Sequence, residues 1–132
     1  MIVDDELFNR ISAKIILKSA GIVLIDSICD TANNGEEAVQ LIMEDAELNN
    51  KCCYDLILMD INMPVLDGCR ATTKIREYLN DLQIDQPIIC GVTGHTEQEY
   101  IDKCIKYGMN KVYSKPLNIA LIKQLLKTLN YI

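Results

Sequence analysis

The stretch of sequence that decides the fold reads DLILMDINMPVLDG and runs from Asp55 to Gly68. Within it, Leu56 to Met59 form an unbroken apolar run, which is typical of a strand buried on both faces of a parallel sheet. Asp60 ends this run, and Pro64 and Gly68 then prevent the strand from continuing. Because open α/β sheets place their chemistry at the carboxyl ends of their strands, the pattern indicates that Asp60 is an active-site carboxylate.

Apolar runs and amphipathic segments alternate along the rest of the chain. Besides Leu56–Met59, the predicted strands are Met1–Val3, which looks like the end of a strand whose beginning is missing, then Val23–Ile28, Ile88–Val92 and Lys111–Ser114. The predicted helices cover Leu7–Ala20, a segment opening at Glu36, Arg70–Leu79, a segment capped by Thr96 and ending at Gly108, and Asn118–Leu129. This alternation predicts an α/β fold with a parallel sheet, in one domain over residues 1–132.

Composition and charge exclude several classes of protein. The chain has 132 residues, 49% of them hydrophobic and 24% charged, which is ordinary for a soluble globular domain with a real core. The net charge of -6 disfavours a nucleic-acid partner. No apolar run approaches the roughly 20 residues of a membrane span. Asp4, Asp5 and Glu6 exclude a signal peptide at the start of this sequence.

The six cysteines do not follow the pattern of a disulfide or zinc framework. Cys52 and Cys53 are adjacent, no C-x-x-C occurs, and there is a single histidine. We therefore expect reduced thiols in a cytoplasmic protein. A redox-sensing pair at Cys52 and Cys53 is the alternative interpretation.

Five polar side chains fall at the carboxyl ends of the predicted strands. They are Asp4 and Asp5 after the first, Asp60 after the third, Thr93 after the fourth and Lys115 after the fifth. Clustered carboxylates repel one another unless a cation neutralises them, and oxygen ligands without His or Cys favour Mg²⁺. Mg²⁺ and Lys115 would neutralise an incoming phosphoryl group, and Thr93 would donate its hydroxyl to it. The pattern predicts that Asp60 is the nucleophile that accepts this group.

Taken together, these segments resemble the receiver domains of response regulators, which act in two-component and phosphorelay signalling. The resemblance implies a doubly wound, flavodoxin-like (βα)5 fold with strand order 2-1-3-4-5. It extends over nearly the whole chain and is carried by Val3-Asp4-Asp5-Glu6, Asn34–Ala38, Asp55–Gly68, Val92-Thr93-Gly94, Gly108-Met109-Asn110 and Lys115-Pro116-Leu117.

The resemblance also assigns roles to the residues at this sheet edge. Asp60 would be the phosphoacceptor, assisted by Thr93 as the switch hydroxyl and by Lys115. Mg²⁺ would be bound directly by Asp5, through water by Asp4, and by Asp60 and the backbone carbonyl of Asn62. A domain of this kind catalyses only its own phosphorylation and dephosphorylation, so we do not expect a turnover enzyme.

One position departs from the pattern of the family. Receiver domains often carry an aromatic residue three positions before the lysine, which swings inward on phosphorylation. Val112 stands there, and Tyr113 follows on the opposite face of the strand. The relay would then depend on a backbone shift, on a different action of Tyr113, or on the Thr93 loop alone. His95 in that loop is expected to be exposed beside the site and to tune water access.

The sequence therefore supports two functional hypotheses. The first is a signalling switch that receives a phosphoryl group from a histidine kinase or a histidine phosphotransfer protein. The second is a receiver-like binding module that does not take phosphate. The segment Met63–Gly68 is similar to receivers fused to hybrid histidine kinases, whose usual docking surface would correspond to Leu7–Ala20 and Pro116. A flavin protein lacks support because no phosphate-binding loop follows the first strand, and an aspartyl phosphatase would need an acid where Asn62 stands.

Overall fold

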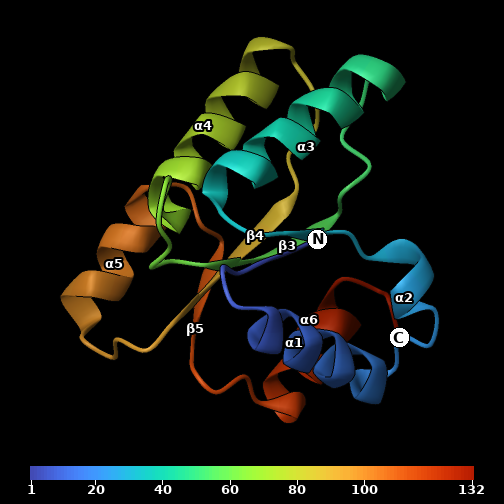
Figure 1. Cartoon of the computed structure of the whole chain (residues 1–132), viewed down its shortest axis with the longest axis vertical. Coiled ribbons are helices and arrows are strands. Elements are labelled where there is room, and N and C mark those ends of the chain that lie inside the picture. The colour runs from blue at the N-terminus through green and yellow to red at the C-terminus, as the bar shows by residue number, and fades with distance from the viewer.

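A five-stranded parallel sheet forms the centre of the computed structural model, which describes all residues from Met1 to Ile132 (Figure 1). The strand order is β2-β1-β3-β4-β5. This confirms the predicted fold class and strand order. The strands are β1 (Ile2–Val3), β2 (Thr31–Ala32), β3 (Leu56–Asp60), β4 (Ile88–Thr93) and β5 (Lys111–Ser114).

Six helices cover the two faces of this sheet. They are α1 (Leu7–Ala20), α2 (Ile25–Ile28), α3 (Gly35–Asn49), α4 (Gly68–Asp81), α5 (Gln98–Lys106) and α6 (Ile119–Thr128). Figure 1 shows α1 and α6 side by side on one face, with α2 beyond them, and α3 and α4 side by side on the other, with α5 beside β5. None of these helices combines the length and the apolar character needed to span a lipid bilayer.

The core lies in two layers, one on each face of the sheet. Ile57 and Met59 of β3 belong to the layer under α3 and α4, whereas Leu58 belongs to the layer under α1 and α6. Because successive side chains of a strand point to opposite faces, a strand covered on both sides must be apolar throughout. This explains the unbroken apolar run in the central strand.

The second strand lies later in the chain than the sequence predicts. The predicted strand Val23–Ile28 is wrong, because this segment forms a turn followed by α2, and Cys29 comes directly after that helix. The strand β1 has only two residues and lies between β3 and β2. On the side of β2, Ile2 and Val3 pair with Thr31 and Ala32.

The apolar stripe of α1 faces away from the core. The helical spacing of Leu7, Ile11 and Ile15 predicts the helix correctly, but these side chains are 63%, 49% and 59% exposed. The buried positions of α1 are occupied mainly by small residues, Ala13 and Ala20, together with Leu17. An outward apolar stripe is therefore available to a partner.

Two other details of the helices differ from expectation. Thr96 does not cap α5, because the N-cap residue is Glu97 and its side chain makes no capping hydrogen bond. The apolar spacing of Ile119, Ile122 and Leu126 predicts that Ile119 faces inward in the last helix, but its side chain is 44% exposed. Both differences concern helix ends, where tertiary packing rather than periodicity decides the orientation of a side chain.

The connection from β3 to α4 brings the helix into contact with the strand end. A side chain on Gly68 would overlap the backbone oxygen of Asp60 and lie 2.9 Å from the Cα of Ile61. Asp67 caps α4 by accepting a hydrogen bond from the backbone N–H of Arg70 at 2.8 Å. The loop between them contains Val65 at φ 70°, a left-handed conformation that is uncommon for a β-branched residue.

Candidate phosphorylation site and metal centre

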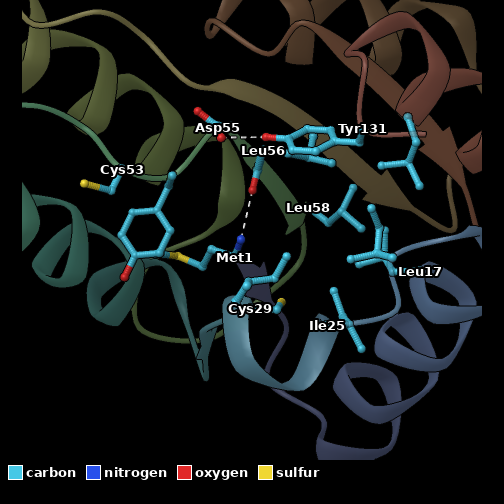
Figure 2. A pocket seen from close by; sticks show the side chains of 13 residues that line it. Met1, Leu17, Ile25, Cys29, Cys53, Asp55, Leu56, Leu58 and Tyr131 are labelled. Atoms are coloured by element: carbon cyan, nitrogen blue, oxygen red, sulfur yellow. Dashed lines mark hydrogen bonds between the residues drawn. The ribbon is translucent and has the colours of Figure 1, made fainter.

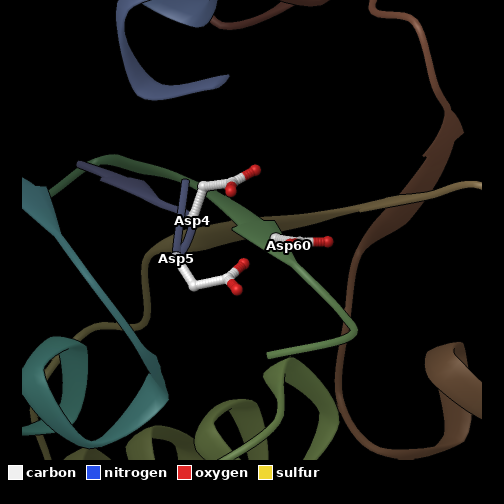
Figure 3. Close-up of side chains that lie close together, drawn as sticks. All are labelled: Asp4, Asp5 and Asp60. Carbon is white, nitrogen blue, oxygen red and sulfur yellow. The ribbon is translucent and has the colours of Figure 1, made fainter. Parts of the chain in front are cut away.

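Three carboxylates converge at the carboxyl edge of the sheet (Figure 3). Each of Asp4, Asp5 and Asp60 offers an oxygen, and these oxygens all lie within 4.8 Å of one another. The register explains the proximity, because Val3 of β1 pairs with Met59 of β3, and the residues that follow them are Asp4 and Asp60. Asp4 and Asp60 are only 7% and 4% exposed, whereas Asp5 is exposed.

The side chain of Lys115, the residue directly after β5, approaches this cluster along the same edge of the sheet. Its Nζ lies 3.1 Å from Oδ1 of Asp60 and 3.8 Å from Oδ2 of Asp4. The lysine is positioned by its own backbone N–H, which donates to the carbonyl of Thr93 at 2.7 Å. Burial lowers the pKa of the ammonium, but the hydrogen bond and charge of Asp60, together with Asp4, outweigh this effect and raise the pKa. Lys115 is therefore charged at neutral pH.

The same surroundings disfavour a negative charge on Asp60. Its pKa is raised, first by burial and then by the charges of Asp4 and Asp5, although Lys115 opposes the shift. Three carboxylates facing one ammonium leave the cluster with an excess of negative charge. Oxygen donors without His or Cys among them match the ligands that Mg²⁺ prefers. The residues present thus fit a divalent cation of this kind.

Asp4 is held in place by the first turn of α1. Its Oδ1 accepts hydrogen bonds from the backbone N–H of Glu6 at 2.9 Å and from Nδ2 of Asn9 at 3.3 Å. Arg10 also donates to the backbone carbonyl of Asp4 at 2.8 Å. Neither Asn9 nor Arg10 was among the site residues predicted from the sequence. Their position about one helical turn after Asp4 and Asp5 could have indicated that their side chains reach back to these acids.

Thr93 and Asn62 lie at the ends of β4 and β3, but neither forms a hydrogen bond to the carboxylates. The hydroxyl of the buried Thr93 accepts from the backbone N–H of His95 at 3.1 Å. Oδ1 of Asn62 accepts from the hydroxyl of Tyr100 at 3.2 Å, and the rings of Tyr100 and His95 lie 4.6 Å apart. Tyr100 is a site residue that sequence reasoning missed.

Two cavities lie at opposite ends of this part of the sheet. One, of about 390 Å³, runs between α1 and the loop after β5 and is lined by Asp60, Lys115 and Phe8 among others. The other lies at the amino edge, where the amino group of Met1 donates to the carbonyl of Leu56 at 2.9 Å (Figure 2). Hydrophobic residues make up 12 of the 13 that line this second cavity, and the remaining one, Asp55, accepts a hydrogen bond from the hydroxyl of Tyr131 at 2.7 Å.

The comparison with protein families agrees with this geometry. The family model described as the response regulator receiver domain matches residues 1–127. The chain belongs to the response regulator receiver domain family. This confirms the family resemblance found in the sequence, and it makes the chain a module of two-component signalling.

Related sequences include both two-component response regulators and histidine kinases. The receiver domain is 38% identical over 130 residues to the two-component response regulator ARR22 of Arabidopsis thaliana, covering 98% of the chain and 81% of that protein. It is 35% identical to hybrid signal transduction histidine kinase B of Dictyostelium discoideum, covering 98% of the chain. The receiver domain spans only 6% of the length of that kinase.

Solved structures include close matches to the fold. The receiver domain of the Arabidopsis thaliana histidine kinase CKI1, complexed with Mg²⁺ and BeF₃⁻, superposes with a TM-score of 0.81 at 28% identity, covering 99% of this chain and 88% of that one. A chain from the co-crystal structure of the Saccharomyces cerevisiae phosphotransfer protein Ypd1 and the receiver domain of Ssk1 superposes with a TM-score of 0.74 at 27% identity. The match covers 96% of this chain and 84% of that one.

Proposed function

We propose that residues 1–132 form one receiver domain that accepts a phosphoryl group from a phosphohistidine onto Asp60. Mg²⁺ would be bound by Asp4, Asp5, Asp60 and the backbone carbonyl of Asn62. The observation that carries the proposal is the buried Asp60 carboxylate, which lies 3.1 Å from the Lys115 ammonium and shares its site with two further carboxylates.

Each side chain has a chemical task in this transfer. An oxygen of Asp60 forms the new bond to phosphorus while the bond from phosphorus to the imidazole of the donor breaks. Lys115 pairs with Asp60 beforehand and with the phosphoryl oxygens afterwards. The Thr93 hydroxyl donates to one of these oxygens. Bound Mg²⁺ would neutralise the charge of the group in transfer. Water later hydrolyses the acyl phosphate, so the domain acts on itself and is not a turnover enzyme.

The exposed stripe of α1 supports a protein as the phosphoryl donor. Leu7, Phe8, Ile11 and Ile15 are exposed large apolar residues, and Phe8 also lines the cavity that reaches Asp60. A partner docked on α1 and Pro116 would hold its phosphohistidine over the site. We propose a histidine kinase or a histidine phosphotransfer protein as this partner, in the cytoplasm. The Ypd1–Ssk1 complex is an example of such a pair among similar structures.

The test is phosphorylation by a small donor. Incubation with acetyl phosphate and Mg²⁺ should add the mass of one phosphoryl group, removable by hydroxylamine. Asp60→Asn should abolish the addition, and Asp81→Asn, at an exposed carboxylate ending α4, should leave it unchanged.

Failure to react has a definite meaning in this experiment. If the intact chain binds Mg²⁺ in an Asp5-dependent manner and still gains no phosphoryl group, phosphoryl acceptance is excluded. The second candidate, a binding module that acts through the exposed face of α1 alone, then remains.

A further inference from the structure

The aromatic side chain near Thr93, in the core layer under α3 and α4, comes from α5 and not from the expected strand β5. Val112 of β5 packs into the layer under α3 and α4, while Tyr113 is buried in the opposite layer with α1 and α6. Tyr100 of α5 packs against the same layer as Val112. The aromatic residue next to the site is therefore supplied by α5 and not by β5.

A chain of contacts runs from Thr93 through Tyr100 to the end of β3. The hydroxyl of Thr93 accepts from the backbone N–H of His95, and the imidazole of His95 lies against the ring of Tyr100. Tyr100 then donates its hydroxyl to Asn62, two residues after Asp60. Val92, just before Thr93, pairs with Asp60 itself. The contacts therefore begin at the end of β4, the strand beside the phosphoacceptor, and end just after β3, the strand that carries it.

The hydrogen bond from Tyr100 to Asn62 is important because α5 has few other buried contacts with the rest of the protein. The helix has nine residues, of which only Cys104 is buried, and its N-terminus lacks a side-chain cap. Cys104 lies one turn after Tyr100 and contacts Sγ of Cys69 in α4 at 3.6 Å. This contact anchors the second half of α5, whereas Tyr100 anchors the first half. Elements with few buried contacts are the ones that move at low energetic cost.

We propose that Tyr100 is a positioning residue that couples the state of Asp60 to the position of α5. The inference rests on the proposed phosphorylation of Asp60. In the free protein the Thr93 hydroxyl accepts from His95, so turning it toward a phosphoryl oxygen changes the loop that carries His95. The imidazole moves the ring of Tyr100 with it, and the Tyr100 hydroxyl leaves Asn62. The N-terminal half of α5 is released about its anchor at Cys104, which changes the surface offered to partners.

A spectroscopic experiment can follow Tyr100 directly. The chain contains six tyrosines, and ¹³C-labelling of their Cζ atoms gives one NMR signal for each phenol. The Tyr100 signal is identified by its loss in Tyr100→Phe. On phosphorylation with acetyl phosphate and Mg²⁺ we expect this signal to shift, and the signal of Tyr131, at the other edge of the sheet, to stay.

Intact mass measured on the same sample separates the two possible failures. A phosphorylated chain whose Tyr100 signal does not move overturns the role of Tyr100 and leaves the proposed function standing. A chain that gains no phosphoryl group overturns the proposed function, and the coupling along with it.

Kinetics of the same reaction distinguish coupling from a purely structural contact. Tyr100→Phe keeps the ring beside His95 and removes only the hydrogen bond of the free state. It should accelerate phosphorylation by acetyl phosphate by about threefold to tenfold, the range of one hydrogen bond. Asn62→Ala, which keeps the backbone carbonyl, should have a similar effect. The double variant should be phosphorylated no faster than either single variant.

Tyr107→Phe is the matched control, because Tyr107 ends the same helix and its hydroxyl makes no hydrogen bond to the site. Additive effects of Tyr100→Phe and Asn62→Ala, or an equal acceleration by Tyr107→Phe, would contradict the proposal.

Discussion

The hydroxyl of Tyr113 is a buried polar group without a hydrogen-bond partner. A buried hydroxyl that gives up its bonds to water and gains none in return destabilises the fold. We expect Tyr113→Phe to raise the free energy of unfolding by about 1 kcal/mol at pH 7, as measured by urea denaturation. A loss of stability would show that the hydroxyl has a bonded partner in solution.

The same phenol should make stability depend on pH in the alkaline range. Burial, followed by the nearby Cys90, raises the pKa of Tyr113 from 10.0 to about 12. Because the pKa is higher in the folded than in the unfolded state, ionisation of this phenol does not affect the free energy of unfolding below pH 10. Above pH 10 it lowers the free energy of unfolding as the pH rises toward 12. The stability advantage of Tyr113→Phe should therefore widen between these two values. A constant advantage would contradict the raised pKa.

Asp60 carries a stability cost because its charge is buried beside two others. The raised pKa of Asp60 means that the folded state disfavours its ionised form. Without Mg²⁺, Asp60→Asn should therefore raise the free energy of unfolding measured by urea denaturation, because the neutral amide removes the buried negative charge. Asp81→Asn serves as the control. A destabilised Asp60→Asn would show that the pair with Lys115 outweighs the repulsion.

At the level of elements, the junction of β3 and α4 should tolerate almost no added volume. Gly68→Ala would place a methyl group against the backbone of Asp60 and Ile61, where neither neighbour can move independently of the sheet. We expect a loss of at least about 2 kcal/mol in urea denaturation. Gly94→Ala is the control, because nothing lies within 4 Å of the added methyl group. Equal effects of the two substitutions would contradict this geometry.

The exposed stripe of α1 should matter to a partner and not to the fold. Phe8 is 77% exposed, so Phe8→Ala should leave thermal stability and the reaction with acetyl phosphate unchanged. Its affinity for a histidine phosphotransfer protein should fall about tenfold, as for an aromatic interface anchor. Leu48→Ala, at an 84% exposed leucine of α3, is the control. Unchanged binding by Phe8→Ala would exclude this face as the docking surface.

These elements also show what the sequence can and cannot predict. Periodicity predicts α1 because it identifies residues that share a face, but it does not tell which face is buried. In α1 the small residues Ala13 and Ala20 face the core and the large ones face outward. The strand β2 escapes prediction because two residues give no periodic signal, and its position depends on the short β1.

For the whole molecule, the architecture and the carboxylate cluster follow from the order of strands and the residues at their ends. The convergence of Asp4, Asp5 and Asp60 was predictable because parallel strands bring their carboxyl ends to one edge. The contact between Tyr100 and Asn62 was not, because it depends on how α5 packs beside β5. A pattern of residues within one element carries no information about that packing.

The two-residue strand β1 has a consequence for the kinetics of folding. The candidate metal ligands lie at the ends of β1 and β3, and β1 is held in the sheet by pairs with partners far along the chain, such as the bond from Met1 to Leu56. Contacts of such long sequence separation form at a high cost in loop-closure entropy. If they form after the rate-limiting step, a cation that binds only the completed cluster would slow unfolding and leave the rate of refolding unchanged. Stopped-flow measurements with and without Mg²⁺ would then show a shift in the unfolding limb alone.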